Sequence, residues 1–292
     1  MSIAGLPRVG FIGAGRLGSS LAAALTSAGY DVATVAGRDA ESSTSLASLL
    51  GPNVQPTTQP ELVLETCELI FLTVQDREIE PLAQRLPWRA SHLVVHCSGA
   101  RGLGVLQRAS AVGAVVGCLH PLQSFPSRTP DPGRFTNIFC GVEGEEPISG
   151  VLERLVATLG ARTIRLEGVD RALYHAAAVF TSNYVIALAS AARRVWTMAG
   201  LPPESAREAL APLILSVAES IGEMELEDAL TGPIARGDVR TIAAHLSALS
   251  PDPALQELYQ CLGTELLDLA VPADPTMHSL LTTTPPPQAS SQ

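Results

Sequence analysis

Three glycines stand at fixed spacing close to the start of the chain, directly after a short apolar run. Residues 9–12 read Val-Gly-Phe-Ile, and the six residues that follow are Gly13, Ala14, Gly15, Arg16, Leu17 and Gly18. In this pattern the first glycine permits a tight turn, the second lets the backbone approach a pyrophosphate, and the third lets a helix pack closely on a strand. The segment therefore predicts that these six residues bind a dinucleotide, with its pyrophosphate at the N-terminus of the next helix. The alternative is a glycine-rich turn of some other α/β protein.

The end of the second predicted strand indicates which nicotinamide cofactor is bound. Enzymes that use NAD usually place Asp or Glu there, whereas NADP sites place an arginine near the 2′-phosphate. Here Gly37 is followed by Arg38 and then Asp39. Because a guanidinium pairs with phosphate at two points, we expect Gly37 and Arg38 to bind NADP(H), and Asp39 to cap the next helix. The alternative is that Arg38 is a solvated loop charge and Asp39 binds the ribose of NAD(H).

Small and polar residues follow three more predicted strands. In a parallel sheet, ligands lie at the carboxyl ends of the strands. The residues expected at this edge are Thr73, Val74, Ser98, Gly99, His120 and Gln123. We predict that the first two contact the adenosine side of the cofactor and that Ser98 and Gly99 lie near the nicotinamide. Ser98 and Gln123 are also candidates for binding substrate, and His120 is either a catalytic residue or a structural histidine.

Polar residues also interrupt the apolar stretch at 169–200, which predicts one long helix. At about 100° per residue, His175, Ser182 and Asn183 border one strip of that helix. Buried polar groups need hydrogen-bond partners, which a ligand can supply. We therefore predict catalytic roles for His175 and Asn183 and substrate binding by Ser182. Hydrogen bonding between helices within the core is the alternative.

A turn at 231–238 contains two glycines and a proline, and it carries Arg236. The guanidinium is predicted to bind a substrate carboxylate, or else to pair with Asp238 and hold the loop.

The composition excludes several kinds of chemistry. All nineteen basic residues are arginine, so the chain has no lysine for Schiff-base chemistry, for a P-loop or for acid catalysis. The net charge of −10 argues against a nucleic-acid partner. We expect no membrane partner and a cytoplasmic protein, because neither a signal-peptide pattern nor about eighteen uncharged apolar residues in a row is found.

The five cysteines are scattered without CxxC spacing, which is typical of reduced thiols. Two histidines and two cysteines occur at 96, 97, 118 and 120, but neighbours on a strand point to opposite faces. We therefore expect no metal site.

The elements that must position these residues follow an alternating pattern. Apolar runs at 9–12, 31–36, 69–74, 93–97, 114–119, 137–142 and 162–166 predict strands, mostly separated by helical segments. Helical periodicity dominates afterwards, with helices predicted at 203–221, 223–230, 239–249 and 252–270. The predicted fold class is α/β, a Rossmann dinucleotide-binding domain at 1–168 followed by an all-α substrate and dimerisation domain at 169–275. Residues 276–292, which contain three consecutive prolines and little that is apolar, are predicted to be a disordered tail.

Seven segments together resemble one bacterial family. They are GFIGAGRLG, VAGRD, IFLTVQD, HCSGA, HPLQSF, YHAAAVFTSNY and LTGPIARGD, and they span the chain to about residue 270. The family combines a Rossmann-like domain with a C-terminal DUF2520 domain, within a 6-phosphogluconate dehydrogenase-like superfamily that includes ketopantoate reductase and pyrroline-5-carboxylate reductase. The resemblance implies that the helical domain closes over the nicotinamide and builds a homodimer.

One departure from the better-known relatives concerns the proton donor. β-Hydroxyacid dehydrogenases, which belong to the same superfamily, and ketopantoate reductase carry a catalytic lysine one turn before an asparagine, whereas Val179 precedes Asn183 by four residues here. The proton must then come from His175, His120, Tyr174 or an ordered water. The expected function is NADPH-dependent reduction of a small oxo-acid such as ketopantoate, by hydride transfer in the interdomain cleft. The alternatives are a pyrroline-5-carboxylate-type imine reductase and a non-catalytic NADP(H)-binding sensor.

Overall fold

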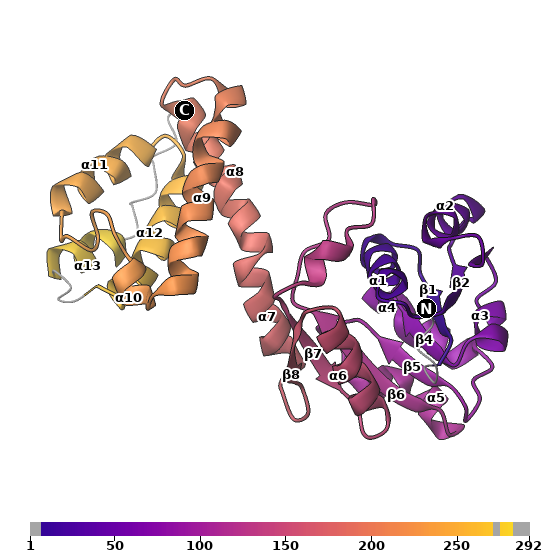
Figure 1. The fold of residues 1–292 in the computed structure, drawn as a ribbon. Helices are drawn as coiled ribbons and strands as arrows, with labels where there is room; N and C mark the ends of the chain where they lie inside the picture. Colours follow the sequence, from indigo (N-terminus) through magenta and orange to yellow (C-terminus); the bar gives the residue numbers. More distant parts are fainter. Residues whose placement is uncertain (1–6, 271–274, 283–292) are drawn as a thin grey trace, which may run out of the picture. The chain divides into compact units, whose positions relative to one another are not determined.

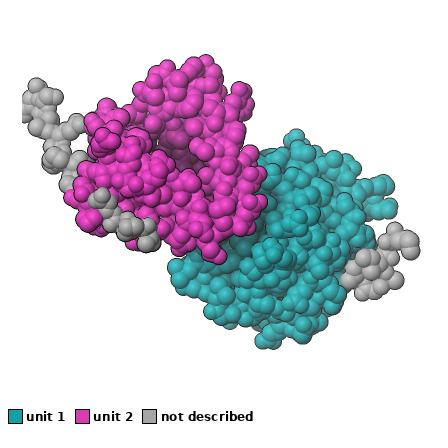
Figure 2. All heavy atoms as spheres, turned by 60° about the vertical axis from the view of Figure 1, so that its left-hand side comes forward, with its two compact units in different colours: residues 1–182 teal, residues 183–292 magenta. Residues whose placement is uncertain are grey.

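The computed structural model describes residues 7–270 and 275–282 of the 292-residue chain. The chain divides into two compact units, Met1–Ser182 and Asn183–Gln292. Figure 2 colours them teal and magenta. Each is described by itself below.

An eight-stranded sheet forms the centre of the first unit (Figure 1). The strands are β1 Val9–Ile12, β2 Val32–Ala36, β3 Gln55–Thr57, β4 Leu69–Leu72, β5 Leu93–His96, β6 Val115–Pro121, β7 Phe139–Glu143 and β8 Arg162–Arg165. Their order is β3-β2-β1-β4-β5-β6-β7-β8, with β1 to β6 parallel, β7 antiparallel to β6, and β8 parallel to β7. The first six strands follow the order of a Rossmann fold, so the direction in which successive strands are added to the sheet reverses between β1 and β4, where dinucleotides bind.

Helices cover both faces of this sheet. They are α1 Arg16–Ser27, α2 Ala40–Leu50, α3 Glu61–Thr66, α4 Asp76–Arg85, α5 Gln107–Ala111 and α6 Ile148–Thr158, with 3-10 turns at Leu103–Leu106 and Pro132–Phe135. Helix α7, Arg171–Thr181, follows the last strand. Alternate strand residues enter two separate apolar cores, because side chains of a strand point to opposite faces. Phe71 of β4 packs in the core under α1, α2 and α6, whereas its neighbour Leu72 packs in the core under α3 and α4. The predicted α/β fold class is confirmed.

The second unit is helical. It contains α8 Asn183–Met198, a 3-10 turn at Pro203–Ser205, α9 Ala206–Glu223, α10 Leu226–Ala229, α11 Val239–Leu249, α12 Pro253–Leu267 and α13 Pro275–Thr282. The last of these corrects the predicted disordered tail at 276–292. Met277 and Leu281 of α13 are buried in a core with Ile242, so this short segment folds because it has an apolar face to bury. Residues 283–292 lie outside the described residues.

The predicted long helix at 169–200 is interrupted. Ser182 has φ −123° and ψ −74°, which ends α7 before α8 begins. Its hydroxyl donates to the carbonyl oxygen of Ala178 at 2.6 Å. Such back-bonding competes with the backbone ladder and bends helices, which accounts for a break at this position.

By length and composition alone, one helical segment of the described residues could cross a membrane. This is Arg171–Met198, whose mean hydropathy is 1.3 and whose most apolar window is entirely unburied. Core helices of water-soluble proteins meet the same criterion of length and composition, so the observation is weak evidence for a membrane span.

Candidate functional site

The glycine loop has the geometry that its sequence predicts. Gly13 has φ +121°, and a Cβ there would lie 2.6 Å from the carbonyl oxygen of Thr73. A Cβ on Gly18 would lie 2.2 Å from the carbonyl oxygen of Gly13, so the start of α1 packs too tightly for any side chain. A Cβ on Gly15, in contrast, would meet no protein atom closer than 3.9 Å. The protein itself does not require glycine at 15, which fits a position kept bare for a pyrophosphate.

Neighbouring predicted residues support this loop. Thr73 is 9% exposed, and its hydroxyl donates to the carbonyl oxygen of Gly13 at 2.7 Å, so the side chain braces the turn. Val74 follows it at the same sheet edge. Gly15 is the N-cap of α1 and has no side chain that could satisfy the free amides there, so they are available to an anion.

The end of β2 carries positive charge, and the Asp39 carboxylate there is already hydrogen-bonded. The Asp39 carboxylate accepts a hydrogen bond from the Ser42 N–H at 2.8 Å, and it caps α2. The pKa of Asp39 is lowered, first by its bonds to Ser42 and also by the charges of Arg38 and Arg128. Arg128 comes from the loop between β6 and β7, which lies beside α1 (Figure 1) and is held there because Ser20 Oγ accepts from the Asp131 N–H. No local sequence pattern reveals this second cation, because Arg38 and Arg128 are ninety residues apart.

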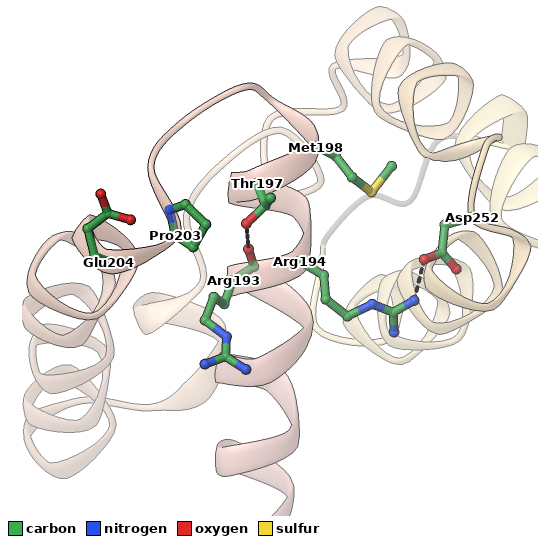
Figure 3. A pocket seen from close by; sticks show the side chains of 7 residues that line it. All are labelled: Arg193, Arg194, Thr197, Met198, Pro203, Glu204 and Asp252. Carbon is green, nitrogen blue, oxygen red and sulfur yellow. Dashed lines mark hydrogen bonds and ion pairs between the residues drawn. The ribbon is translucent and has the colours of Figure 1, made fainter.

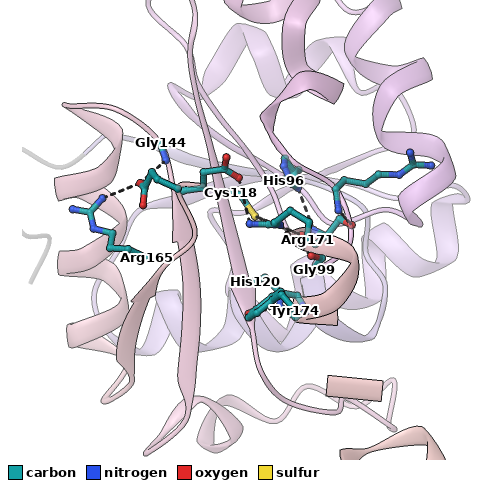
Figure 4. Close-up of polar contacts among 12 residues, drawn as sticks. His96, Gly99, Cys118, His120, Gly144, Arg165, Arg171 and Tyr174 are labelled. Atoms are coloured by element: carbon teal, nitrogen blue, oxygen red, sulfur yellow. Dashed lines mark hydrogen bonds and ion pairs between the residues drawn. The ribbon is translucent and has the colours of Figure 1, made fainter. Parts of the chain in front are cut away.

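A histidine–tyrosine pair lies at the carboxyl end of β6 (Figure 4). His120 Nδ1 and Tyr174 Oη are 2.9 Å apart, and the two rings meet edge to face. The His175 ring centroid is 6.0 Å from that of His120. Between the imidazoles lies Gly99, where a Cβ would be 2.7 Å from both His120 Nε2 and His175 Nδ1. The structure therefore brings three predicted residues, Gly99, His120 and His175, together with Tyr174.

Burial keeps the members of this pair uncharged. It lowers the pKa of His120 to about 4, helped by the charges of His175 and Arg171 and opposed by Asp76. It also raises the pKa of Tyr174 to about 12. Near pH 7 the hydroxyl and the imidazole are thus both neutral, and a single hydrogen is shared between Oη and Nδ1. The His175 Nδ1 atom is buried and has no hydrogen-bond partner among the described residues.

Ser98 is held inside the protein by its side chain. It is 3% exposed, and its hydroxyl donates to the Asp76 carboxylate at 2.6 Å and accepts from the Arg101 N–H at 3.2 Å. Its backbone N–H donates to His96 Nδ1, which leaves the buried His96 Nε2 without a partner among the described residues. Burial, with the charges of Arg171 and His120, lowers the pKa of His96 to about 3.

Family models match two segments of the chain. Residues 4–121 match a Rossmann-like domain, and residues 138–266 match a domain of unknown function, DUF2520. The chain is a Rossmann-like protein with a DUF2520 domain. This confirms the family that its sequence motifs resemble. His120 lies in the Rossmann-like segment and Tyr174 in the DUF2520 segment, so their hydrogen bond joins the two.

Solved structures share the fold over nearly the whole chain. A proposed NADP oxidoreductase from Bacteroides fragilis is 28% identical, over 90% of this chain and 98% of that one, with a TM-score of 0.75. A reductive aminase from Aspergillus terreus, in complex with NADPH and ethyl-5-oxohexanoate, is 14% identical over 94% and 98%, with a TM-score of 0.67. A 1-pyrroline-5-carboxylate reductase from Streptococcus pyogenes is 15% identical over 95% and 99%, with a TM-score of 0.62. The last two show the fold alone. No protein of curated function matches the sequence.

Two of the remaining predicted residues of the DUF2520 segment, Asn183 and Arg236, belong to the second unit. Ser182 ends the first unit, and Asn183 begins the second at the start of α8. Arg236 is exposed in the turn before α11, where the Asp238 carboxylate accepts from the N–H and hydroxyl of Thr241. Asp238 therefore caps α11. The roles predicted for Ser182, Asn183 and Arg236 stay predictions, as does that of Gln123, whose exposed side chain accepts from the Ser124 N–H.

A hollow of about 670 Å³ lies in the second unit (Figure 3). It is lined by Arg193, Arg194, Thr197, Met198, Pro203, Glu204 and Asp252. Arg194 forms an ion pair with Asp252, and Glu204 balances Arg193, so the lining carries no net charge. The predicted site residues do not line it.

Among residues 7–270 and 275–282, no group of three or more His, Cys, Asp or Glu side chains is arranged to hold a metal ion. Cys67, Cys97, Cys118 and Cys140 are buried free thiols, and Cys261 is an exposed one. Burial raises the pKa of Cys118 to about 11 and that of Cys140 to about 12.

Proposed function

We propose that this protein is an NADPH-dependent reductase of a small oxo-acid or imino-acid. The observation that carries the proposal is the His120–Tyr174 pair at the same sheet edge as a glycine loop left open at Gly15. The proposed NADP oxidoreductase from Bacteroides fragilis, similar over nearly its whole length, supports an oxidoreductase. The reductive aminase and the pyrroline-5-carboxylate reductase that share the fold agree with this class of reaction.

Tyr174 is the group to which we assign the proton. When bound, the reduced nicotinamide supplies a hydride, and a carbonyl that accepts it also needs a proton. The sequence contains no lysine to provide one. With its pKa raised to about 12, Tyr174 keeps its hydrogen. In the tautomer with hydrogen on His120 Nδ1, that atom donates to Tyr174 Oη and leaves the phenolic hydrogen free for the substrate oxygen.

We assign to Arg236 the binding of the substrate carboxylate. Arg236 lies exposed in the turn before α11. Ketopantoate is the oxo-acid that we would test first. A cyclic imine of the pyrroline-carboxylate kind is the second candidate, favoured by the absence of lysine, because an imine can arrive already protonated and needs no strong acid.

The test is NADPH oxidation by the purified protein with small 2-oxo acids, ketopantoate among them, and with cyclic imines, each repeated with NADH. Turnover with an oxo-acid supports the proposed reaction, and turnover with imines alone supports the second candidate. Tight NADPH binding without turnover on any member of the panel would contradict both and favour a non-catalytic NADP(H)-binding sensor.

Arg38 and Arg128 are proposed to select NADP(H) by pairing with the 2′-phosphate, because the charges of both arginines act on Asp39 at the end of β2. Replacing Arg38 by alanine is expected to weaken NADPH binding about 10- to 100-fold, the worth of one charge-assisted hydrogen bond. Arg128→Ala should act in the same direction and less strongly. NADH, which lacks the phosphate, should bind both variants like the wild type.

Titration of both cofactors against each variant measures this selectivity. Arg108→Ala, an exposed arginine on α5, is the matched control and should change neither affinity. Equal losses for NADPH and NADH in Arg38→Ala would contradict the assignment of the 2′-phosphate.

We also propose that the protein is a homodimer. Large apolar side chains lie exposed on α8 and α9 of the second unit, with Ile186, Leu213 and Leu215 all more than 60% exposed. A second copy of the chain would cover them. Light scattering that gave the mass of a single 30.5 kDa chain would contradict this proposal.

The cysteines bear on where such an enzyme works. All five described cysteines are free thiols, as a reducing compartment would keep them. This supports the expected location in the cytoplasm.

A further inference from the structure

We propose that Arg171 is a positioning residue, which holds the face of α7 that carries Tyr174 and His175 against the ends of β5 and β6. The proposal rests on the proposed function, because the group it places is the proton-donating hydroxyl. The predictions from sequence did not include Arg171.

The Arg171 guanidinium contacts the loop after β5 and the strands β6 and β7 (Figure 4). Nε donates to the carbonyl oxygen of Gly99 at 3.1 Å, and Nη2 donates to that of Ser98 at 2.9 Å. Nη2 also lies 3.0 Å from Cys118 Sγ of β6, and Nη1 lies 3.3 Å from the Glu143 carboxylate at the end of β7. The side chain is only 10% exposed. A planar fork with donors in several directions suits these contacts, and an ammonium does not.

Apolar packing cannot account for how α7 is held. None of the eleven residues of α7 is fully buried, and Leu173 and Phe180 are 71% and 66% exposed. The inward face is polar instead. Besides Arg171, this face makes contacts through Tyr174, which bonds to His120 and packs where Gly141 has no side chain, and through His175, whose ring meets that of His120. The polar contacts of Arg171 therefore make up a large share of the attachment of α7 to the sheet.

Helix geometry connects this attachment to the proton donor. Tyr174 and His175 follow Arg171 by three and four residues, so all three lie on one face of α7. The two carbonyl oxygens that accept from Arg171 belong to the loop that contains Gly99. Gly99 lies between the rings of His120 and His175. Ser98 is fixed on its other side by Asp76. The Arg171 guanidinium thus fixes the positions of both α7 and the loop that contains Gly99, and the two imidazoles lie between them.

The test compares Arg171→Met, which keeps the aliphatic length and removes the donors, with Arg171→Lys. We expect kcat to fall about 100-fold in Arg171→Met, as for a misplacement of about 1 Å, with NADPH affinity retained. Arg171→Lys should recover only part of the loss, because it keeps the charge and lacks the fork. Amide hydrogen exchange in α7 of the cofactor-free protein should be faster in both variants.

The pH profile gives a readout that a structural role alone would not move. Arg171 lowers the pKa of His120 together with burial and His175, whereas Asp76 raises it. His96 and Tyr174 are the other titratable groups around this ring. The acid limb of kcat should therefore shift to higher pH in Arg171→Met.

Arg165→Met is the matched control, because Arg165 pairs with Glu153 and Glu167 on the exposed side of β8. An unchanged kcat and unchanged α7 exchange in Arg171→Met would overturn the proposal, as would equal effects in Arg165→Met.

If Arg171→Met fails to fold, Glu143→Gln, which leaves the carbonyl contacts in place, should give a smaller loss of kcat in the same direction; no loss would overturn the proposal. A wild type without turnover would contradict the proposed function, and α7 exchange would still decide whether Arg171 holds the helix.

Discussion

Replacing Tyr174 by phenylalanine is expected to lower kcat for an oxo-acid by about 10²- to 10⁴-fold, the usual contribution of a positioned general acid. The change removes the hydroxyl that lies 2.9 Å from His120 Nδ1 and leaves the ring in place. NADPH affinity should stay as in the wild type, because the glycine loop is untouched. With a cyclic imine the loss should be much smaller, since a protonated imine does not depend on this hydrogen.

Steady-state kinetics with both substrate classes measure the effect, and Tyr259→Phe is its control. Tyr259 forms a second tyrosine–histidine pair, with Oη 2.8 Å from His245 Nδ1, in the second unit. That variant should keep its kcat. A Tyr174→Phe protein with the oxo-acid turnover of the wild type would rule out Tyr174 as the donor and turn attention to His175.

The pH dependence of the wild type offers a check on the same assignment. The reaction needs neutral His120, present above its pKa of about 4, and protonated Tyr174, present below its pKa of about 12. Turnover should therefore be flat across the neutral range. A donor histidine of ordinary pKa would instead lose activity as the pH rises above about 6.5.

The second large effect is expected at Gly15. Gly15→Ala should fold normally, because its Cβ would meet nothing closer than 3.9 Å. The variant should bind NADPH about 10- to 100-fold more weakly, because the methyl group occupies the space through which the pyrophosphate approaches the backbone. Gly18→Ala should lower both the melting temperature and the affinity, because its Cβ would lie 2.4 Å from Thr73 Oγ1.

Calorimetric binding and thermal unfolding of the two variants separate these effects. Gly104→Ala serves as the control, since a Cβ at Gly104 meets nothing within 4 Å and the position is outside the glycine loop. If Gly15→Ala binds NADPH like the wild type, the dinucleotide does not approach the backbone at this position.

The sheet could be predicted from sequence because its strands are apolar runs that local pattern detects. Seven strands were predicted within a few residues of their bounds. The eighth, β3 at Gln55–Thr57, was missed because it is three residues long, mostly exposed and centred on Pro56. Its pairing with β2 depends on the neighbouring strand rather than on its own pattern.

The detailed geometry of a part of the site can be predicted from sequence where a single segment carries the information. The glycine loop is such a segment, and its geometry follows from its own residues. The contacts of Ser98 with Asp76 and of Arg171 with Glu143 join residues far apart in the chain, which no local pattern reveals. The strip drawn through His175, Ser182 and Asn183 assumed one helix of constant phase. Ser182 lies outside both helices, and the face of α7 that meets the sheet runs backwards from His175 to Arg171.

The buried cysteine thiols limit which inhibitors can act at the carboxyl ends of β5 and β6, where the two imidazoles lie. Cys97, Cys118 and Cys140 lie in or beside the strands that lead there, which invites the design of electrophiles aimed at sulfur. With a pKa of about 11, Cys118 is a thiolate in only about one molecule in 10,000 at pH 7, and only the thiolate attacks. Covalent warheads would therefore react first with exposed Cys261 on α12, and selective inhibition has to come from reversible ligands shaped to the imidazole pair.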